Sequence, residues 1–183
     1  MPPADPAVQP AEDADLIAAW LAGEERAAAE LVRRHARALA RFLAGAGAPE
    51  ADLDDLVQDT FIRAFRAMRG FRHQCQFRTW LLTIGGNALK DLGRRLVRHR
   101  IVPLDEGVES RDGNPHERAE AGETEDRLRR GIEGLPRMQR EVFLLRAQQG
   151  VEYDEIAVAL RTTPGAARVH YHHAVKRLKE WLK

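Results

Sequence analysis

Basic and polar side chains recur at helical spacing through residues 164–183, where they could bind DNA. Arg168, Val169 and His172 fall near the start of this segment, and the first turns of such a helix can reach base edges in a major groove. Lys176 and Arg177 follow, at a place where cations meet backbone phosphates. The spacing therefore predicts a DNA recognition helix.

The elements that would position these side chains form a helix-turn-helix pattern. Small Ala157 lets the two helices approach closely, Thr163 suits the N-cap and Pro164 suits the first position of the second helix. One face of that helix is expected to be core, and its residues are Ala167, Tyr171, Ala174, Leu178 and Trp181, with Val175 and Leu182 beside them. A basic, solvated helix in an unrelated bundle remains the alternative on this pattern alone.

Other side chains were weighed for metal, redox or enzymatic chemistry. His170 and His173 share a helix face, but no cysteine or carboxylate stands near them to complete a tetrahedral site. Cys75 is the single cysteine, which excludes an intramolecular disulfide framework and leaves only a lone-thiol redox role open. The sequence also lacks a glycine-rich phosphate loop and a nucleophile–base constellation. We therefore expect no metal, no cofactor and no enzymatic activity.

Charge divides the 183-residue chain, although its formal net charge is only +1. Residues 31–104 hold fourteen basic and six acidic residues, and residues 127–183 hold twelve and six. Between them, residues 105–126 hold nine acidic and two basic residues. Two basic modules around an acidic spacer suggest that each module meets a polyanion, although solvated helix faces would give the same balance.

Apolar residues recur at helical spacing through most of the chain, and no long stretch alternates with the period of a strand. We therefore predict an all-α fold of two small helical domains joined by a flexible acidic linker. The expected boundaries are a disordered tail at 1–12, a first domain at 13–98, the linker at 99–126 and a second domain at 127–183. Pro49 is expected at the first position of a helix. Without a secretory signal or a run of 18 apolar residues, we expect a cytoplasmic protein without membrane insertion.

Several motifs together are typical of one protein family. Residues 55–61 read DLVQDTF and residues 77–81 read FRTWL, while residues 153–157 read YDEIA in the second domain. In this order, with a linker between, they resemble bacterial RNA polymerase sigma factors of the extracytoplasmic-function (ECF) group, which keep only regions 2 and 4. The resemblance covers about residues 13–98 and 127–183.

The resemblance implies a transcription initiation factor that binds core RNA polymerase, recognises the −10 and −35 promoter elements and promotes DNA melting. It also implies control by an anti-sigma factor. Core-polymerase binding would fall to Asp55, Gln58 and Asp59. The residues implied at the −10 element are Arg72, His73, Gln74, Gln76, Arg78, Asn87, Lys90, Arg94 and Arg95. Those implied at the −35 element are Arg161, Thr163, Arg168, Val169, His172, His173, Lys176 and Arg177.

The linker length is compatible with these implied roles. Two duplex elements about 25 base pairs apart are separated by roughly 85 Å at 3.4 Å per step. A 28-residue linker spanning residues 99–126 reaches up to about 90 Å when extended. Two modules held on polymerase could therefore reach both elements.

Two departures from the family pattern and two alternative functions remain. Gly85 and Gly86 stand where the family commonly has alanine and a basic or polar residue. Residues 165–170 read GAARVH where the family often reads GTVKSR, so the promoter sequence cannot be carried over.

A sigma-like decoy would bind an anti-sigma factor without using DNA, but this chain keeps its basic residues and has no room for a receiver domain. An ordinary helix-turn-helix repressor would leave the DLVQDTF motif unexplained.

Overall fold

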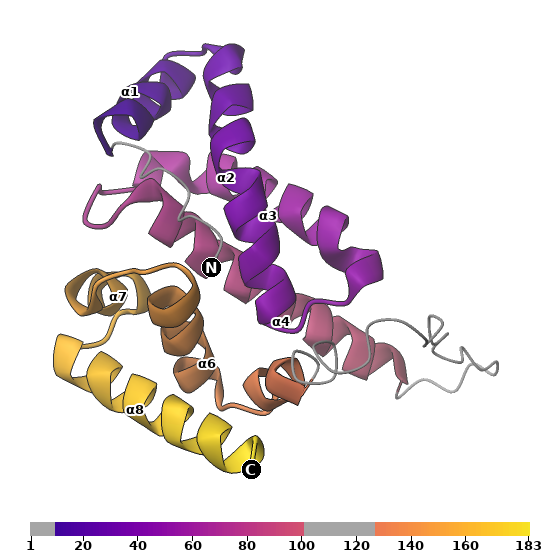
Figure 1. The fold of residues 1–183 in the computed structure, drawn as a ribbon. Coiled ribbons are helices and arrows are strands. Elements are labelled where there is room, and N and C mark those ends of the chain that lie inside the picture. Colours follow the sequence, from indigo (N-terminus) through magenta and orange to yellow (C-terminus); the bar gives the residue numbers. More distant parts are fainter. Residues whose placement is uncertain (1–9, 101–126) are drawn as a thin grey trace, which may run out of the picture.

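The computed structural model describes residues 10–100 and 127–183, with side chains within 13–95 and 127–183. Across these residues the chain forms helices joined by turns, without a strand, which confirms the predicted all-α fold (Figure 1). The predicted tail and linker lie outside the described residues except at their edges. There the helices run further than expected, because α1 begins at Pro10 and α4 continues to Arg100. None of the described helices is both long and apolar enough to cross a membrane.

Four helices build the N-terminal module: α1 (Pro10–Leu21), α2 (Glu25–Gly45), α3 (Leu53–Ala67) and α4 (Phe77–Arg100). The apolar residues Leu31, Leu39 and Phe42 of α2 are spaced by eight and three residues. These spacings are close to two turns and one turn of a helix, so the three residues lie on one side of α2. They pack against Phe61 of α3 and Leu81 of α4, and all five side chains are buried. This shared core fixes the faces that α3 and α4 turn outward.

A buried hydrogen bond ties α1 to α2. His35 Nε2 lies 2.9 Å from Asp13 Oδ2, and the residues are only 1% and 6% exposed. Arg34 Nη1 lies 3.7 Å from the other carboxylate oxygen, and the His35 ring meets Phe77 edge to face at 5.2 Å. Because Phe77 begins α4, this pair also supports the helix that carries the predicted −10 residues.

Gly85 allows α4 to pass close to α2 and α3. A Cβ atom at this position would lie 2.8 Å from Leu39 Cδ1, closer than real Cβ atoms approach, and 3.5 Å from Thr60 Cγ2, an ordinary contact distance. The departure from the family pattern at this position therefore has a packing role.

Pro49 differs from the sequence-based expectation. It serves as the N-cap of a 3₁₀ turn, Glu50–Asp52, with φ −59° and ψ 139°, and α3 begins only at Leu53. The extended ψ places proline just outside the helical residues, and the extra turn separates it from α3. The prediction of a first helical position was therefore wrong.

The C-terminal module is a compact group of short helices. Residues 127–133 are helical, and they are followed by α6 (Arg137–Phe143), a π-helical segment (Leu144–Gln148), α7 (Tyr153–Leu160) and α8 (Pro164–Trp181). Buried Val142, Leu145 and Ile156 meet Ala167 and Ala174 of α8. The alanines keep one side of α8 close to the other helices, so its remaining sides face outward.

The predicted helix-turn-helix is present as α7, a tight turn and α8. Arg161 ends α7 in the left-handed conformation, with φ 54°. Thr163 is the N-cap of α8, where its Oγ1 accepts a hydrogen bond from Ala166 N at 3.1 Å, and Pro164 follows at the first helical position. Ala157 is buried between the helices, as the sequence predicted.

The end of α8 is less buried than its apolar residues suggest. Trp181 is 57% exposed and Leu182 is 38% exposed, although Ala167, Ala174 and Leu178 on the same face are buried. Trp181 lies over residues 127–133 instead, where its Nε1 donates to Arg127 O at 3.2 Å. The last turn of α8 extends past the core, so the expected core face ends at Leu178.

The two modules pack against each other. In Figure 1, α7 lies against α4, and the contacts also join the end of α2 to the π-helical segment. Gln148 Nε2 in that segment donates to Arg41 O at 3.1 Å, and Arg140 Nη1 donates to Ala46 O at 3.2 Å. These bonds hold the helix-turn-helix beside the N-terminal module.

Candidate nucleic-acid interface

The outer side of α8 carries the predicted −35 residues. Exposed side chains gather there on the side opposite buried Ala167 and Ala174, and they are Arg168, Val169, His172, His173, Lys176 and Arg177. Val169 is 52% exposed, so an apolar side chain stands among cations and histidines. Such a surface can offer hydrogen bonds and charge to a duplex and an apolar contact to a thymine methyl group. The structure therefore brings this part of the predicted set together.

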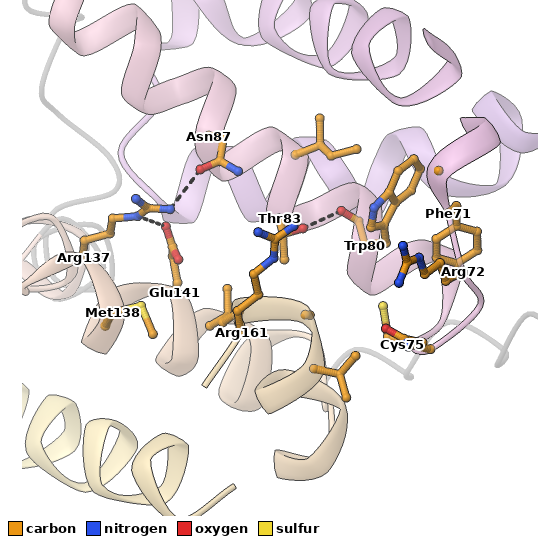
Figure 2. Close-up of a pocket in the computed structure, with 16 residues that line it drawn as sticks. Phe71, Arg72, Cys75, Trp80, Thr83, Asn87, Arg137, Met138, Glu141 and Arg161 are labelled. Atoms are coloured by element: carbon orange, nitrogen blue, oxygen red, sulfur yellow. Dashed lines mark hydrogen bonds and ion pairs between the residues drawn. The ribbon is translucent and has the colours of Figure 1, made fainter. Parts of the chain in front are cut away.

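Arg161 and Thr163 occupy a different place from the α8 group. Arg161 lines a cleft toward α4 (Figure 2). The Thr163 hydroxyl is exposed but accepts the capping bond from Ala166. Both precede the outer face of α8, so the described structure does not gather the whole −35 set on one surface.

Residues 72–76, the −10 loop, hold four of the predicted −10 residues and stand on an aromatic cluster. Phe71 lies 4.8 Å from Trp80 and 6.1 Å from Phe77 between ring centroids, and the His73 ring packs on Phe71 at 4.7 Å. His73 adopts φ 54°, the left-handed conformation of a tight bend. Four side chains of this loop are exposed, and they are Arg72, His73, Gln74 and Gln76. Trp80 is half-buried: it packs with the other rings and also lines the cleft.

Cys75 is unsuited to thiolate chemistry. Burial, with a smaller contribution from the nearby charge of Glu155, raises the pKa of its thiol to about 11. The thiolate is the reactive form, so the thiol stays protonated and unreactive at neutral pH. This environment gives no support to the redox role that the sequence left open.

The duplex-facing residues predicted on α4 form a polar stripe. Asn87, Arg94 and Arg95 are exposed and Lys90 is half-buried. Asp91 lies within the stripe, and its hydrogen bond with Arg63 lowers its pKa. The stripe is therefore not purely cationic, although its overall charge is positive.

The predicted core-polymerase residues lie together on the outer side of α3. Asp55 and Gln58 are exposed, and Asp59 is half-buried, with Leu56 and Thr60 buried on the inner side. Gln58 and Asp59 follow Asp55 by three and four residues, so both lie beside it on one face of the helix.

Arg63 fixes this acidic face to α4, a link that the sequence reasoning missed. Its Nε lies 2.8 Å from Asp59 Oδ2, and its Nη1 lies 2.7 Å from Asp91 Oδ2. The spacing of Asp59 and Arg63 could have indicated the first pair, but only the fold reveals the second. Ile62 was also missed, and it stands 41% exposed on α3.

A cleft of about 930 Å³ separates the −10 loop and α4 from α6 and α7 (Figure 2). Arg137 Nη2 donates across the interface to Asn87 Oδ1 at 2.9 Å, and Arg137 also pairs with Glu141. Gln76 N donates to Glu155 Oε1 at 2.9 Å. Arg78 donates to Gln149 Oε1. Three predicted −10 residues therefore bond to the second module.

The described side chains show no metal-binding group. Among residues 13–95 and 127–183, no three His, Cys, Asp or Glu side chains are grouped to hold an ion. His172 and His173 rings lie 6.3 Å apart, while the His170 ring lies elsewhere on α8 and is half-buried. Polar recognition of a macromolecule is the chemistry that this arrangement can perform.

Comparisons with known proteins place both modules in one family. The Sigma-70 region 2 model matches residues 31–99, and the Sigma-70 region 4 model matches residues 125–178. The RNA polymerase sigma factor NccH of Alcaligenes xylosoxydans xylosoxydans is 34% identical over 179 residues, covering 95% of this chain and 96% of NccH. The ECF RNA polymerase sigma factor SigM of Mycobacterium tuberculosis is 31% identical over 170 residues, covering 93% and 84%.

A solved structure extends this similarity to the arrangement of the helices. The structure of CnrH in complex with the cytosolic domain of CnrY matches with a TM-score of 0.70 and 31% identity, covering 93% of this chain and 97% of CnrH. Because both regions match in order and nearly the whole chain aligns with such proteins, this chain belongs to the sigma-70 family of RNA polymerase sigma factors, in its ECF group.

Proposed function

We propose that this chain binds core RNA polymerase and directs it to promoters with a −10 and a −35 element. The observation that carries the proposal is the match of regions 2 and 4, in order, to two modules that each expose a polar, DNA-compatible face. The chain itself would contribute no covalent step, because the polymerase performs the chemistry. It would act in the cytoplasm, where promoter DNA and polymerase meet.

The outer face of α3 is the proposed docking surface for polymerase. Asp55 and Gln58 are exposed there, and the Arg63 bridge holds Asp59 in a fixed position. Acidic side chains near a helix N-terminus also complement its dipole, which alone would explain Asp55. It does not explain Gln58, which is neither charged nor apolar.

The −10 loop and α4 are proposed to bind the element that melts. Unstacking a base costs a few kcal/mol, and a pocket for the extruded base recovers part of that cost. The exposed loop residues stand on the ring cluster of Phe71, Phe77 and Trp80, which gives the loop a firm base. Asn87 and Lys90 on α4 would face the adjoining duplex.

The packed arrangement must open for this function. Gln76, Arg78 and Asn87 bond to the second module, and α7 lies against α4. Two elements roughly 85 Å apart cannot be read by modules in direct contact. We therefore infer that the modules separate when polymerase and promoter bind, and that the linker residues 99–126 span the gap.

Control by an anti-sigma factor is the regulatory part of the proposal. The similar protein CnrH was solved with the cytosolic domain of CnrY. A partner that holds the two modules together would keep the cross-module bonds in place. Co-purification of the chain with such a partner from its own cell would support this part, and a chain that never associates would count against it.

Assembly with core polymerase separates this function from its alternatives. On size exclusion, the full chain should elute with purified core polymerase, and an excess of another sigma factor should displace it. A decoy for an anti-sigma factor or an ordinary repressor would elute alone. Separate elution at micromolar concentrations would therefore contradict the proposed function.

A further inference from the structure

The Arg168 guanidinium lies over the ring of Tyr153, the first residue of α7. Its Cζ is 5.3 Å from the ring centroid. A guanidinium within about 6 Å of a ring centroid is attracted to the negative face of the ring. We propose that Tyr153 is a positioning residue, which orients Arg168 to read a guanine in the −35 duplex. This inference rests on the proposed function, because it takes α8 as the helix that reads DNA.

Tyr153 is itself fixed by other rings. Its centroid lies 6.1 Å from that of Tyr171, at an interplanar angle of 74°, and Tyr171 stacks on Phe143 at 6.0 Å. These rings come from α7, α8 and α6 and are all half-buried. The surface beneath Arg168 is therefore part of the packed module.

A second arginine on the same ring is already committed. Arg146 Cζ lies 5.0 Å from the Tyr153 centroid, while its Nη1 donates to Val151 O at 3.0 Å and to Glu152 Oε1 at 2.6 Å. The hydrogen bond with Glu152 raises the pKa of Arg146. Arg168, in contrast, pairs with no carboxylate in the part of the chain that the structure describes. Its N–H donors are therefore available to a ligand.

A cation–π contact is compatible with base recognition by arginine. The guanidinium carries five N–H donors, and attraction to a ring does not use them as hydrogen-bond donors. Two of those donors can pair with O6 and N7 of guanine, the commonest specific contact of arginine in the major groove. A side chain held by a cation–π contact has also lost part of its rotamer freedom before binding, which lowers the entropic cost of the contact. Phosphate oxygens accept the same donors, and the experiment must distinguish them.

The test measures holoenzyme binding to promoter duplexes that carry each of the four base pairs at every −35 position. Arg168→Ala should lose discrimination at one base pair, by about 5- to 150-fold. Tyr153→Leu should lower the preference for guanine at that same position by about two- to fivefold. Tyr153→Phe keeps the ring and should match the wild type. In an Arg168→Ala background, Tyr153→Leu should cause no further loss.

Controls separate positioning from packing. Thermal melting must show that Tyr153→Leu folds, and its −10 preference must be unchanged; if it does not fold, Tyr153→Met replaces it under the same criteria. An equal penalty for all base pairs, or a penalty that persists without Arg168, would overturn the proposal and make Tyr153 a packing residue.

Two further outcomes concern the ligand. A uniform loss in Arg168→Ala across all sequences, with a smaller dependence on salt, would indicate a phosphate contact and overturn the guanine assignment. A wild-type holoenzyme without any −35 preference would contradict the proposed reading of DNA by α8, and this inference with it. If only the roles of Tyr153 and Arg168 are wrong, the wild-type holoenzyme still shows a −35 preference. Failure of this inference is therefore distinguishable from failure of the proposed function.

Discussion

Neighbouring acids at the start of α3 differ in the face they occupy. Asp54 and Asp55 both lie in the first turn and are exposed, but Asp55 shares its face with Gln58 and Asp59. Asp55→Ala should therefore weaken binding to core polymerase, while Asp54→Ala should bind as the wild type does. Both should lose the same small dipole interaction, because both lie near the positive end of the helix.

Competition against a labelled sigma factor measures the affinity of the Asp54 and Asp55 variants for core polymerase. Thermal melting of the same variants measures the loss of the dipole interaction. Equal affinities of the two variants for core polymerase would argue that the acids only stabilise the helix end.

The buried pair of Asp13 and His35 should matter for stability rather than for binding. Asp13→Ala leaves the buried His35 Nε2 without its hydrogen-bond partner, and a buried polar group left unsatisfied costs about 1–3 kcal/mol. Asp15→Ala, in the same helix but exposed, should change the free energy of unfolding by less than about 0.5 kcal/mol. Urea denaturation of both variants gives the comparison, and similar midpoints would show that the pair contributes little.

Cys75 should react slowly with alkylating reagents in the folded chain. Because burial raises its pKa from the ordinary 9.0 to about 11, the rate of modification should keep rising with pH beyond 9. Ionisation of this thiol disfavours the folded state, because its pKa is higher in the folded chain than in the unfolded one. The free energy of unfolding is therefore unaffected by this group below pH 9 and falls as the pH rises from 9 toward 11. Iodoacetamide labelling followed by mass spectrometry measures the rate, and a plateau between pH 8 and 9 would refute this environment.

At the scale of helices, Gly45 at the end of α2 is a point where the two modules approach each other closely. A Cβ there would lie 2.9 Å from Gln148 Nε2 and 3.2 Å from Leu144 Cδ2, whereas nothing lies within 4 Å of a Cβ at Gly93 in α4. Leucine has a higher helix propensity than glycine at both sites. Gly45→Leu should therefore push the modules apart without weakening α2. Gly93→Leu should leave the modules in their original arrangement.

A distance between spin labels on α3 and α8 tests this contrast, with Cys75 replaced by alanine and cysteines placed at exposed Ala67 and Lys179. Gly45→Leu should lengthen or broaden the distance distribution. Identical distributions for the two leucine variants would mean that the contact at Gly45 does not hold the modules together.

Local signals predicted most of the helices. Thr163 and Pro164 mark the start of α8 because capping and proline geometry depend on neighbouring residues only. Pro49 was misplaced by the same reasoning, since a 3₁₀ turn and a helix can begin with similar residues. The exposure of Trp181 could not be predicted, because it depends on how far α8 extends past its neighbours.

The candidate site was predicted in outline but not in its contacts. The spacing of residues in α3 and α8 identified their exposed faces, because a helix repeats every 3.6 residues. The bonds from Arg137 to Asn87 and from Gln76 to Glu155 join residues 50 and 79 positions apart, so no local pattern indicates them. The cation–π contact of Arg168 with Tyr153 likewise depends on the packing of α7 against α8.

At the scale of the whole molecule, each module carries a surface that is proposed to read DNA, and the two modules pack against each other. Three of the residues that would read the −10 element, Gln76, Arg78 and Asn87, bond to the C-terminal module, while the outer face of α8 remains exposed. The acidic residues 105–126 lie between the basic stretches 31–104 and 127–183, and together with the acidic residues 1–30 they keep the net charge at +1. An exposed α8 and a partly covered −10 surface are compatible with the proposal that the chain binds core polymerase before both modules contact DNA.

Transcription by core polymerase with and without this chain, on fragmented genomic DNA, tests the central claim most directly. Sequencing of the run-off products should reveal new, discrete start sites that appear only with the chain and share two sequence blocks upstream. Polymerase that binds the chain yet starts at no new sites, or sites without a common two-block motif, would contradict the account.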